Sequence, residues 1–268
     1  MSGSGQDVLK LLSWNVNGLK NKDRTNGVLR EIKDSHVVFL QETHIGPDDT
    51  GVLHELEDFK KYFTKYNGYS RGVAILIRET VAWEDVWQVE DPEGRSLILT
   101  GKLRGQLYTF VNVYNPSNDT DLLNKLILEH DLGVLVIGGD FNTALNPQLD
   151  RGGRKINPRH NALRPCVKRF MKRFNLVDIW RVKNLKKRDY TFKVLSRLDY
   201  FFMQEVNFHL VQHCAIKNIG ISDHDPVCLN LARNDLSKKD VSLDSKGWES
   251  VHAAESLRTA AESLRTAA

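Results

Sequence analysis

The chain has 268 residues, of which 41% are hydrophobic and 27% are charged, and its formal net charge is +4. This length suits one large α/β domain, and no apolar run approaches the roughly 20 residues that a membrane-spanning helix needs. The three cysteines, Cys166, Cys214 and Cys228, are widely spaced, odd in number and outside any metal-ligand pattern. We therefore expect a monomeric intracellular protein with reduced thiols and no membrane partner.

The two ends of the chain differ from the rest in composition. Residues 1–6 are small and polar, and they lack the charged and then apolar layout of a secretory signal. Near the other end, the seven residues Ala253–Thr259 recur as Ala260–Thr266 after a polar stretch. We therefore expect a tag-like segment at 1–6, one folded domain at 7–233, and at 234–268 a linker with an appended helix, either natural or left by cloning.

Strand-like and helix-like stretches alternate along the chain. Apolar runs rich in β-branched and aromatic residues predict strands, and the segments between them have helix-length patterns, which together favour a layered fold of α/β or α+β type. The predicted strands are Val8–Trp14, Val37–Gln41, Gly72–Ile77, Trp83–Val89, Ser96–Leu103, Leu107–Tyr114, Val134–Asp140, Leu198–Phe202 and Val227–Leu231. The predicted helices are Arg24–Lys33, Asp121–His130 and Asn161–Phe174.

Positive charge is concentrated in one segment, from Arg151 to Arg188. This segment holds 14 Lys or Arg residues and one acid, Asp178, which gives +13, so the rest of the chain carries +4 minus +13, or −9. The block is either a solvated face or a contact surface for a polyanion such as a nucleic acid. The helix predicted inside it is amphipathic, with an apolar side and a basic side formed respectively by Leu163, Val167, Phe170 and Phe174 and by Arg164, Lys168 and Lys172.

Polar side chains follow three of the predicted strands at the point where each strand ends. Asn15 lies in SWNVNG, and Glu42 follows the strand Val37–Gln41 in QETH. Asp140 and Asn142 follow an apolar run in VIGGDFN, where two glycines predict a sharp turn that presents both side chains. Taken alone, Asn15 would be a strand-end cap and Glu42 a structural residue, whereas the carboxylate after the paired glycines is a stronger signal of function.

Two further strand ends carry acids and a histidine. Asp199 lies in SRLDYFF, and ISDHDPV supplies Asp223 and His224 before the last predicted strand. A single histidine is usually a core or surface residue, but one with an acid on each side is a better candidate for chemistry. If these strand ends converge, their oxygens suit a hard cation, and their acids and imidazole suit proton transfer at a phosphorus centre. The phenol of Tyr114, in VNVYNP, would position phosphoryl oxygens.

The motifs occur in an order that identifies a family. The series SWNVNG, QETH, VNVYNP, GGDFN, DIW, YTF, SRLDYFF and SDHDP resembles the exonuclease–endonuclease–phosphatase superfamily in sequence and in order, and it spans about Val8 to Ala232. Any one motif would be weak evidence, but eight in order make a chance match implausible. The resemblance implies a four-layer α/β sandwich of the DNase I-like type, with two packed mixed β-sheets flanked by helices, and a metal-dependent phosphodiesterase.

The resemblance also implies roles for residues on the metal side of the site. Glu42, with Asn15 nearby, would hold Mg2+, or Mn2+ in its place. Asp140 matches the family aspartate that aligns or deprotonates the attacking water. Asn142 would lie beside it, on the phosphate.

The remaining catalytic roles are implied in the same way. His224 matches the histidine that binds the phosphate and stabilises the transition state, and Asp199 would hold its ring. Asp223 matches a carboxylate next to the metal region. Tyr114 would contact the scissile phosphate.

The motifs around the catalytic set favour one branch of the family. In abasic-site repair endonucleases of the exonuclease III type, a tryptophan three residues before the Asp of the LDYF motif helps to form the pocket for a base-less sugar. Ser196 occupies that position here. The SRLDYF, DIW, YTF and LDRGG motifs instead resemble the endonuclease domain of long interspersed, non-LTR retrotransposons.

The expected function is therefore a DNA endonuclease that nicks one strand of duplex DNA and leaves a 3′-hydroxyl to prime target-primed reverse transcription. A repair endonuclease for abasic sites is the first alternative. A small-molecule or lipid phosphoesterase is the second, although the +13 segment suits a long polyanion better. A complete element would carry a reverse transcriptase on the same polypeptide, bind the element RNA, and act in the nucleus.

Four residues are expected to contact the DNA. Arg151 matches a DNA-contacting arginine of the family, Thr191 and Ser222 stand just before two catalytic strand ends, and Asn17 lies in SWNVNG. Only seven residues separate Thr191 from Asp199, fewer than in the mammalian elements whose protruding hairpin here helps to recognise DNA. This connection is either a shortened recognition element or a tight hairpin with no recognition role.

Overall fold

The computed structural model describes most of the predicted domain. The described residues are 8–49, 51, 53, 56–116, 119–126, 133–152 and 158–232, without the side chains of 158–160. The segments expected at 1–6 and 234–268 lie outside these residues, so the domain boundaries stay predictions. Within the described ranges, no helix has the length and apolar character to cross a membrane.

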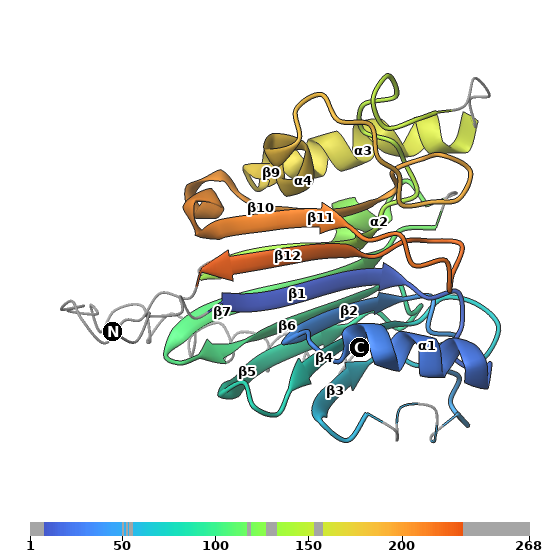
Figure 1. The fold of residues 1–268 in the computed structure, drawn as a ribbon, viewed down its shortest axis with the longest axis vertical. Helices are drawn as coiled ribbons and strands as arrows, with labels where there is room; N and C mark the ends of the chain where they lie inside the picture. Colours follow the sequence, from blue (N-terminus) through green and yellow to red (C-terminus); the bar gives the residue numbers. More distant parts are fainter. Residues whose placement is uncertain are drawn as a thin grey trace, which may run out of the picture. The chain divides into compact units, whose positions relative to one another are not determined.

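The described strands form two mixed sheets of six strands each (Figure 1). In the first sheet the central pair, β1 and β2, is parallel, and each other neighbouring pair is antiparallel. The strand order is β11 (Val211–Ile216), β12 (Val227–Ala232), β1 (Val8–Asn15), β2 (Val37–Gln41), β4 (Val73–Arg78) and β3 (Phe59–Phe63).

The second sheet repeats this plan. Its central pair, β7 and β8, is parallel, and its other neighbouring pairs are antiparallel. The strand order is β5 (Trp83–Glu90), β6 (Ser96–Leu103), β7 (Gln106–Tyr114), β8 (Val134–Asp140), β10 (Asp199–Gln204) and β9 (Leu176–Asp178).

The two sheets pack face to face through alternate residues of their central strands. Phe39 of β2 meets Phe110 of β7 and Phe201 of β10 edge to face, with ring centroids 5.9 Å and 5.5 Å apart. Because successive strand residues point to opposite faces, the other half of each strand's apolar side chains points away from this interface. Each sheet therefore needs a second cover on its outer face.

Helices provide that cover. Val28 and Ile32 of α1 (Lys22–Ile32) are buried on the outer face of the first sheet, and Val167 and Phe170 of α3 (Pro158–Arg173) on the outer face of the second. The apolar side predicted for α3 is thus the buried one. The short helix α2 (Leu122–Lys125) packs with α3, while α4 (Ile179–Lys183) follows β9 and the 3₁₀ helix η1 (Glu205–Leu210) joins β10 to β11. The four-layer α/β sandwich is confirmed.

All nine predicted strands are present with small differences at their ends, and the strands that the sequence did not predict lie at sheet edges. β3, β9 and β11 each have only one neighbouring strand in their sheet, and many of their residues are partly or fully exposed. None of the three has the continuous apolar run by which a strand is predicted. The helix predicted at Asp121–His130 is a single turn at α2, and residues 127–130 lie outside the described part.

Strand direction brings the polar strand ends to one edge of the sandwich. β1, β2, β7 and β8 end at this edge, while β10 and β12 begin there because they run antiparallel to their neighbours. The register places Asp140 opposite Tyr114 on one side and opposite Asp199 on the other. This edge carries the predicted site.

Candidate active site

Asn15 joins the two sheets at the shared edge. Its Nδ2 donates to Glu42 Oε1 at 2.9 Å and to Asp140 Oδ2 at 3.0 Å, and its Oδ1 accepts from the backbone N–H of Asn17 at 3.1 Å. The amide is buried because β1 lies at the centre of its sheet. The Nδ2 of this one side chain therefore bonds two carboxylates, one from each sheet. Glu42 directly follows β2, and Asp140 is the last residue of β8.

Asp140 is 1% exposed and is held by its own loop as well as by Asn15. Its Oδ1 accepts from the backbone N–H of Asn142 at 2.8 Å. The side-chain amide of Asn142 donates to the Asn115 carbonyl at 3.1 Å, and its backbone has φ +50°, a left-handed conformation that asparagine tolerates. The turn after β8 thus points Asn142 back across its own aspartate.

The glycines before Asp140 have a different role from the one predicted. Gly138 and Gly139 lie inside β8 and make no turn. A Cβ on Gly139, whose φ is +152°, would lie 1.9 Å from the Val113 carbonyl oxygen, and a Cβ on Gly138 would lie 2.8 Å from the Phe201 ring. Glycine is required because neighbouring strands and the inter-sheet core approach this backbone closely.

His224 lies between two carboxylates. Its Nδ1 is 2.8 Å from Asp199 Oδ2, and its Nε2 is 3.9 Å from Asp140 Oδ2. Two contacts that the sequence analysis did not identify fix the residue: Trp14 Nε1 donates to the His224 carbonyl at 2.8 Å, and the Phe192 ring lies 4.8 Å from the imidazole centroid. Asp140, Asp199 and His224 lie at or near the ends of three different strands, so only the tertiary fold places them together.

The charges in this cluster shift each other's protonation. Burial raises the pKa of Asp140 to about 7, and the neighbouring Asp199 carboxylate adds to the effect. Burial alone would lower the pKa of His224, but the attraction of Asp199 and Asp140 outweighs it and raises that pKa to about 10. At neutral pH the site therefore holds an imidazolium beside a carboxyl group poised between its two forms.

Glu42 forms the other side of the site. Burial acts to raise its pKa, but hydrogen bonds from His44, Asn15 and Tyr114 lower it below the usual value, so the carboxylate is ionised at neutral pH. Burial and the charges of Glu42 and Asp140 raise the pKa of Tyr114, so its phenol stays neutral and can donate. His44 Nε2 lies 3.2 Å from Glu42 Oε2. His44 belongs to the QETH motif but was not among the predicted site residues.

The backbone around Glu42 is held in an unfavourable conformation. Glu42 has a φ of +52°, in the left-handed region that glutamate rarely adopts, and His44 has a φ of +55°, which histidine tolerates better. Their conformation is fixed by hydrogen bonds: the Gly18 amide donates to the Glu42 carbonyl at 2.7 Å, and the His44 amide donates to the Arg71 carbonyl at 3.0 Å. Such strain persists only where the surrounding structure enforces it, and it is common at functional sites.

Asp223 and its neighbours connect the last loop to β1. Asn17 Nδ2 donates to Asp223 Oδ1 at 3.1 Å, and the Ser222 hydroxyl donates to the Asn15 carbonyl at 2.9 Å. Asp223 remains partly exposed beside the buried His224. Four of the predicted residues are therefore joined in two pairs, which hold the SDHDP loop against the end of β1.

Sequence comparison places this geometry in a known family. The family model described as Endonuclease/Exonuclease/phosphatase family matches residues 12–224, a range that contains every site residue described above. The chain belongs to this family.

Individual relatives agree with that assignment. The chain is 26% identical over 241 residues to the Transposon TX1 uncharacterized 149 kDa protein of Xenopus laevis, which covers 84% of this chain and 18% of the relative. The chain thus spans less than a fifth of that protein's length. Among solved structures, the AP endonuclease LMAP of Leishmania major superposes with a TM-score of 0.71 at 17% identity over 85% of this chain and 88% of that chain. The Xenopus laevis APE2 catalytic domain has a TM-score of 0.69 at 20% identity over 84% and 94%. These two likenesses show the fold.

Two of the four residues that we expected to contact DNA have buried hydroxyls in this member of the endonuclease/exonuclease/phosphatase family. The Thr191 hydroxyl is fully buried and accepts from the backbone N–H groups of Leu198 and Asp199 at 3.0 Å and 3.2 Å. The Ser222 hydroxyl is 2% exposed and is bonded to Asn15. In this structure both hydroxyls bond the backbone next to site residues, and their contact with DNA stays a prediction.

Arg151 is placed differently. It is 9% exposed, and its Nε has no hydrogen-bond partner among the described residues. Burial and the nearby Arg164 lower its pKa. Among the described residues this buried guanidinium has no ion pair with a carboxylate, and it lies beside a second guanidinium, so this position favours an anion.

The acidic residues leave two places for a cation. Ligand atoms of Asp140, Asp199 and His224 lie within 4.8 Å of one another, close enough to surround one ion. However, the imidazole is already bonded to Asp199 at 2.8 Å and has a raised pKa, and a protonated ring cannot bind a metal. The ionised Glu42 carboxylate, 23% exposed, is the better ligand.

Proposed function

We propose that this chain hydrolyses phosphodiester bonds in duplex DNA and nicks one strand. The observation that carries the proposal is the buried Asp140–His224–Asp199 cluster, in which a carboxyl with a raised pKa lies 3.9 Å from an imidazolium held by a second carboxylate. Asp140 in its deprotonated form can accept a proton from an attacking water. The His224 cation can neutralise the charge that develops on the phosphoryl oxygens.

We assign the neighbouring groups to positioning the phosphate. The neutral phenol of Tyr114 lies beside Glu42 and can donate to a phosphoryl oxygen. The Asn142 amide already points across Asp140, at 3.3 Å from Oδ2, so a phosphate bound there would meet a second donor. These groups are fixed before substrate binds, which is what stabilisation of a transition state requires.

The residues present fit a divalent cation, and we propose Mg2+, with Mn2+ able to replace it. Glu42 would hold it, because its carboxylate is ionised, partly exposed and oriented by Asn15 and His44. Asp223, partly exposed at the opposite loop, is the second acid near this place. An oxygen ligand set favours Mg2+ over Zn2+, and the bound ion would supply charge to a phosphate oxygen.

The substrate is proposed to be duplex DNA because of the basic segment and its place beside the site. The segment from Arg151 to Arg188 carries +13, and Arg151 pairs through its backbone with Ser196, which pairs with Phe192, which in turn pairs with His224. A long polyanion gains from many such charges at once, whereas a lipid or sugar phosphate needs only one or two.

We further propose that the chain is the nicking part of a non-LTR retrotransposon. The relative named for a transposon is the observation in favour, together with Ser196, which stands where repair enzymes of the resembling family have a pocket-forming tryptophan. The nick would leave a 3′-hydroxyl for target-primed reverse transcription. A reverse transcriptase on the same polypeptide and the element RNA would be partners, and the site of action would be nuclear.

Nicking of supercoiled plasmid in the presence of Mg2+ tests the proposal. We expect open circles with 3′-hydroxyl ends, no product in EDTA, and restoration by Mg2+ or Mn2+ but not by Zn2+. A parallel assay compares a random-sequence duplex with the same duplex carrying one abasic site. Strong preference for the abasic site would favour a repair endonuclease, and an unchanged plasmid with release of phosphate from a lipid substrate would favour a phosphoesterase.

A further inference from the structure

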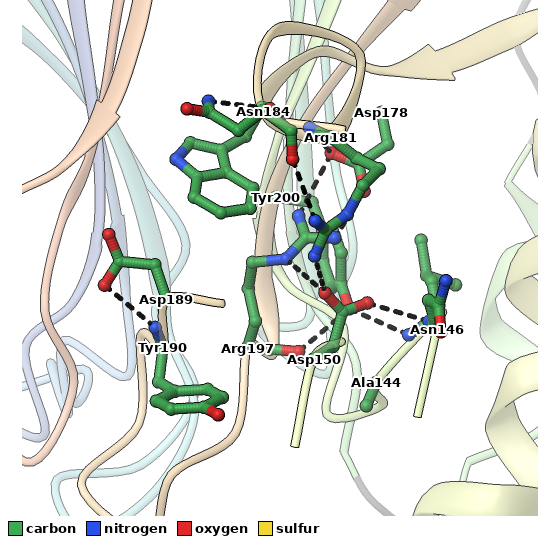
Figure 2. A network of polar contacts seen from close by, with 12 residues as sticks. Ala144, Asn146, Asp150, Asp178, Arg181, Asn184, Asp189, Tyr190, Arg197 and Tyr200 are labelled. Atoms are coloured by element: carbon green, nitrogen blue, oxygen red, sulfur yellow. Dashed lines mark hydrogen bonds and ion pairs between the residues drawn. The ribbon is translucent and has the colours of Figure 1, made fainter. Parts of the chain in front are cut away.

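A buried network of four charges lies next to the catalytic edge and takes no part in the chemistry above (Figure 2). Arg197, 1% exposed, donates from Nε to Asp150 Oδ1 at 2.9 Å. Its Nη1 and Nη2 donate to the two oxygens of Asp178 at 3.0 Å and 2.6 Å. Arg181 bonds the same Oδ1 of Asp150. Two positive and two negative groups make the network neutral.

Aromatic rings enclose the central guanidinium. The Arg197 carbon Cζ lies 5.0 Å from the Trp180 ring and 4.5 Å from the Tyr200 ring. The Tyr200 hydroxyl contacts the carbonyls of Arg197 and Thr143 at 2.8 Å. Every side of Arg197 therefore meets a carboxylate, a ring or the chain, and its side chain has one available position.

The network connects the segments that carry the site. Asp150 directly precedes Arg151, and its carbonyl accepts from the Arg197 backbone N–H at 2.9 Å. Arg197 stands two residues before Asp199, which holds His224. Arg181 extends the network to the basic loop, because its Nη1 donates to the carbonyls of Asn184 and Lys187 at 2.9 Å and 2.8 Å.

Stability alone does not account for four buried charges. Removing ions from water costs about as much as their attraction returns, and apolar side chains of similar volume often serve equally well. What charged pairs add is geometry. The planar fork of an arginine accepts one arrangement of a carboxylate, so the Asp178 pair and the Asp150 contact together define where the first residues of β10 lie.

We propose that Arg197 is a positioning residue for catalysis. Through Asp150 and Asp178 it sets the start of β10, and hence Asp199 and His224, relative to the loop that carries Arg151. The network would thereby fix the positions of Asp199 and His224 relative to Arg151, the arginine proposed to contact DNA. This inference rests on the proposed nicking activity.

The test is the conservative variant Arg197→Lys, which keeps the charge but cannot bond both carboxylates as the fork does. We expect single-turnover nicking at saturating protein to fall about 10–100-fold, because small displacements of reacting groups have effects of this order. Plasmid affinity should change less than about threefold, since one buried arginine contributes no phosphate contact. A single-turnover nicking rate of Arg197→Lys equal to that of the wild-type protein would overturn the proposal.

A matched control separates positioning from stability. Arg78 is also a partly buried arginine that binds carbonyls, donating from Nε to Ser35 O at 2.9 Å, but it lies at the end of β4, far along the sheet from the site. Arg78→Lys should lower the thermal midpoint and leave the single-turnover rate of folded protein unchanged. A rate loss equal to that of Arg197→Lys would show that both act through stability alone, contrary to the proposal.

Hydrogen exchange needs no substrate, so it tests the positioning role of Arg197 separately from the proposed nicking activity. Hydrogen exchange at the amides of Leu198 and Asp199, which donate to Thr191 Oγ1, should accelerate in Arg197→Lys while β1 and β2 stay protected. Exchange that is unchanged, or faster everywhere, would count against positioning even if wild-type protein did not nick DNA. If Arg197→Lys fails to fold, Arg181→Lys is tested instead, because Arg181 lies at the more exposed end of the network. We expect the same changes in nicking rate and in hydrogen exchange, but smaller ones.

Discussion

Asp140 and His224 show how burial and neighbouring charge prepare two ordinary residues for catalysis. Asp140 is 1% exposed and His224 6%, so both feel each other and Asp199 with little screening by water. The result is an acid and a base whose pKa values have moved in the same direction, upward, by different causes. Burial dominates for Asp140, and attraction to carboxylates overcomes burial for His224.

Removal of either group should abolish nicking without unfolding the protein. Asp140→Asn keeps the size of the side chain but replaces one acceptor oxygen by an NH2 group and cannot accept a proton, and His224→Ala removes the cation. We expect single-turnover rates roughly 10²–10⁴-fold lower for each, with plasmid binding retained. Rates within a few-fold of wild type for either variant would show that the roles are misassigned; circular dichroism provides the folding control.

The pH dependence should be bell-shaped. Asp140 must be deprotonated, so the rate rises with pH through about 7, and His224 must be protonated, so the rate falls as pH rises through about 10. Asp199→Asn removes a charge that raises both pKa values, so both limbs should move to lower pH. The measurement is the single-turnover rate at constant ionic strength and metal concentration, and a rate that stays level across neutral pH would contradict it.

Among elements, the loop after β8 and the helix α3 share the basic segment but differ in how they hold their charge. Arg151 is buried, whereas Lys168 lies on the exposed side of α3. Asp150, next to Arg151 in the chain, is already paired with Arg181 and Arg197, and Arg151 Nε has no hydrogen-bond partner among the described residues. A buried cation placed in this way is suited to a phosphate, while an exposed lysine is served by water.

Arg151→Ala should therefore weaken duplex binding and lower the slope of log affinity against log salt by about one, because one phosphate contact releases about one counterion. Lys168→Ala should have a smaller effect. Affinities are to be measured across a salt series in the Asp140→Asn background so that substrate persists. Equal slopes for Lys168→Ala and Arg151→Ala would extend the footprint along α3, and no change in either would make the basic block a solvated face.

The connection between Thr191 and Asp199 is a tight hairpin, a shape compatible with both sequence-based alternatives. Phe192 and Ser196 exchange backbone hydrogen bonds at 2.9 Å and 3.3 Å, and Leu195 closes the turn with φ +52°. Its tip is apolar and exposed: Val194 is 70% and Leu195 50% exposed. Whether it reads DNA sequence stays a prediction, and nick mapping on random-sequence duplex with the tip changed to Gly-Ser tests it.

At the scale of the whole molecule, the site depends on how the two sheets pack, because each contributes about half of it. Phe39 lies fully buried between the sheets and meets rings from two strands of the second sheet. The approach is close enough that a Cβ on Gly138 would lie 3.3 Å from the Phe39 ring of the other sheet and 2.8 Å from the Phe201 ring of the neighbouring strand. A change in the distance between the two sheets would therefore displace Asn15 and Asp140 relative to each other.

Phe39→Ala should lower the free energy of unfolding by about 3–5 kcal/mol, the usual cost of emptying a buried aromatic site. Phe39→Leu should cost less because it leaves a smaller cavity. Denaturant titration measures both, and a loss below about 1 kcal/mol for the alanine variant would mean that the sheets close over the gap. Nicking by folded Phe39→Ala should fall too, since the Asn15 bridge spans the same interface.

The sequence by itself predicted the strands of the sheet interiors, the edge strand β5, and the polar residues that gather at one edge of the sandwich. These are local properties: a central strand such as β8 is an unbroken apolar run, and GGDFN or SDHDP places its polar residues directly at a strand end. Edge strands such as β9 and β11 carry no such run and were not predicted.

Only the tertiary structure decided which of these groups meet and which way they point. Asn15 and Asp140 are 125 residues apart and share a hydrogen bond because two sheets pack at one edge. The same packing turned the Thr191 and Ser222 hydroxyls inward to the backbone, buried Arg151, and gave Gly138 and Gly139 a role in close approach instead of a turn. Side-chain direction and burial depend on neighbours distant in sequence, and no local pattern contains them.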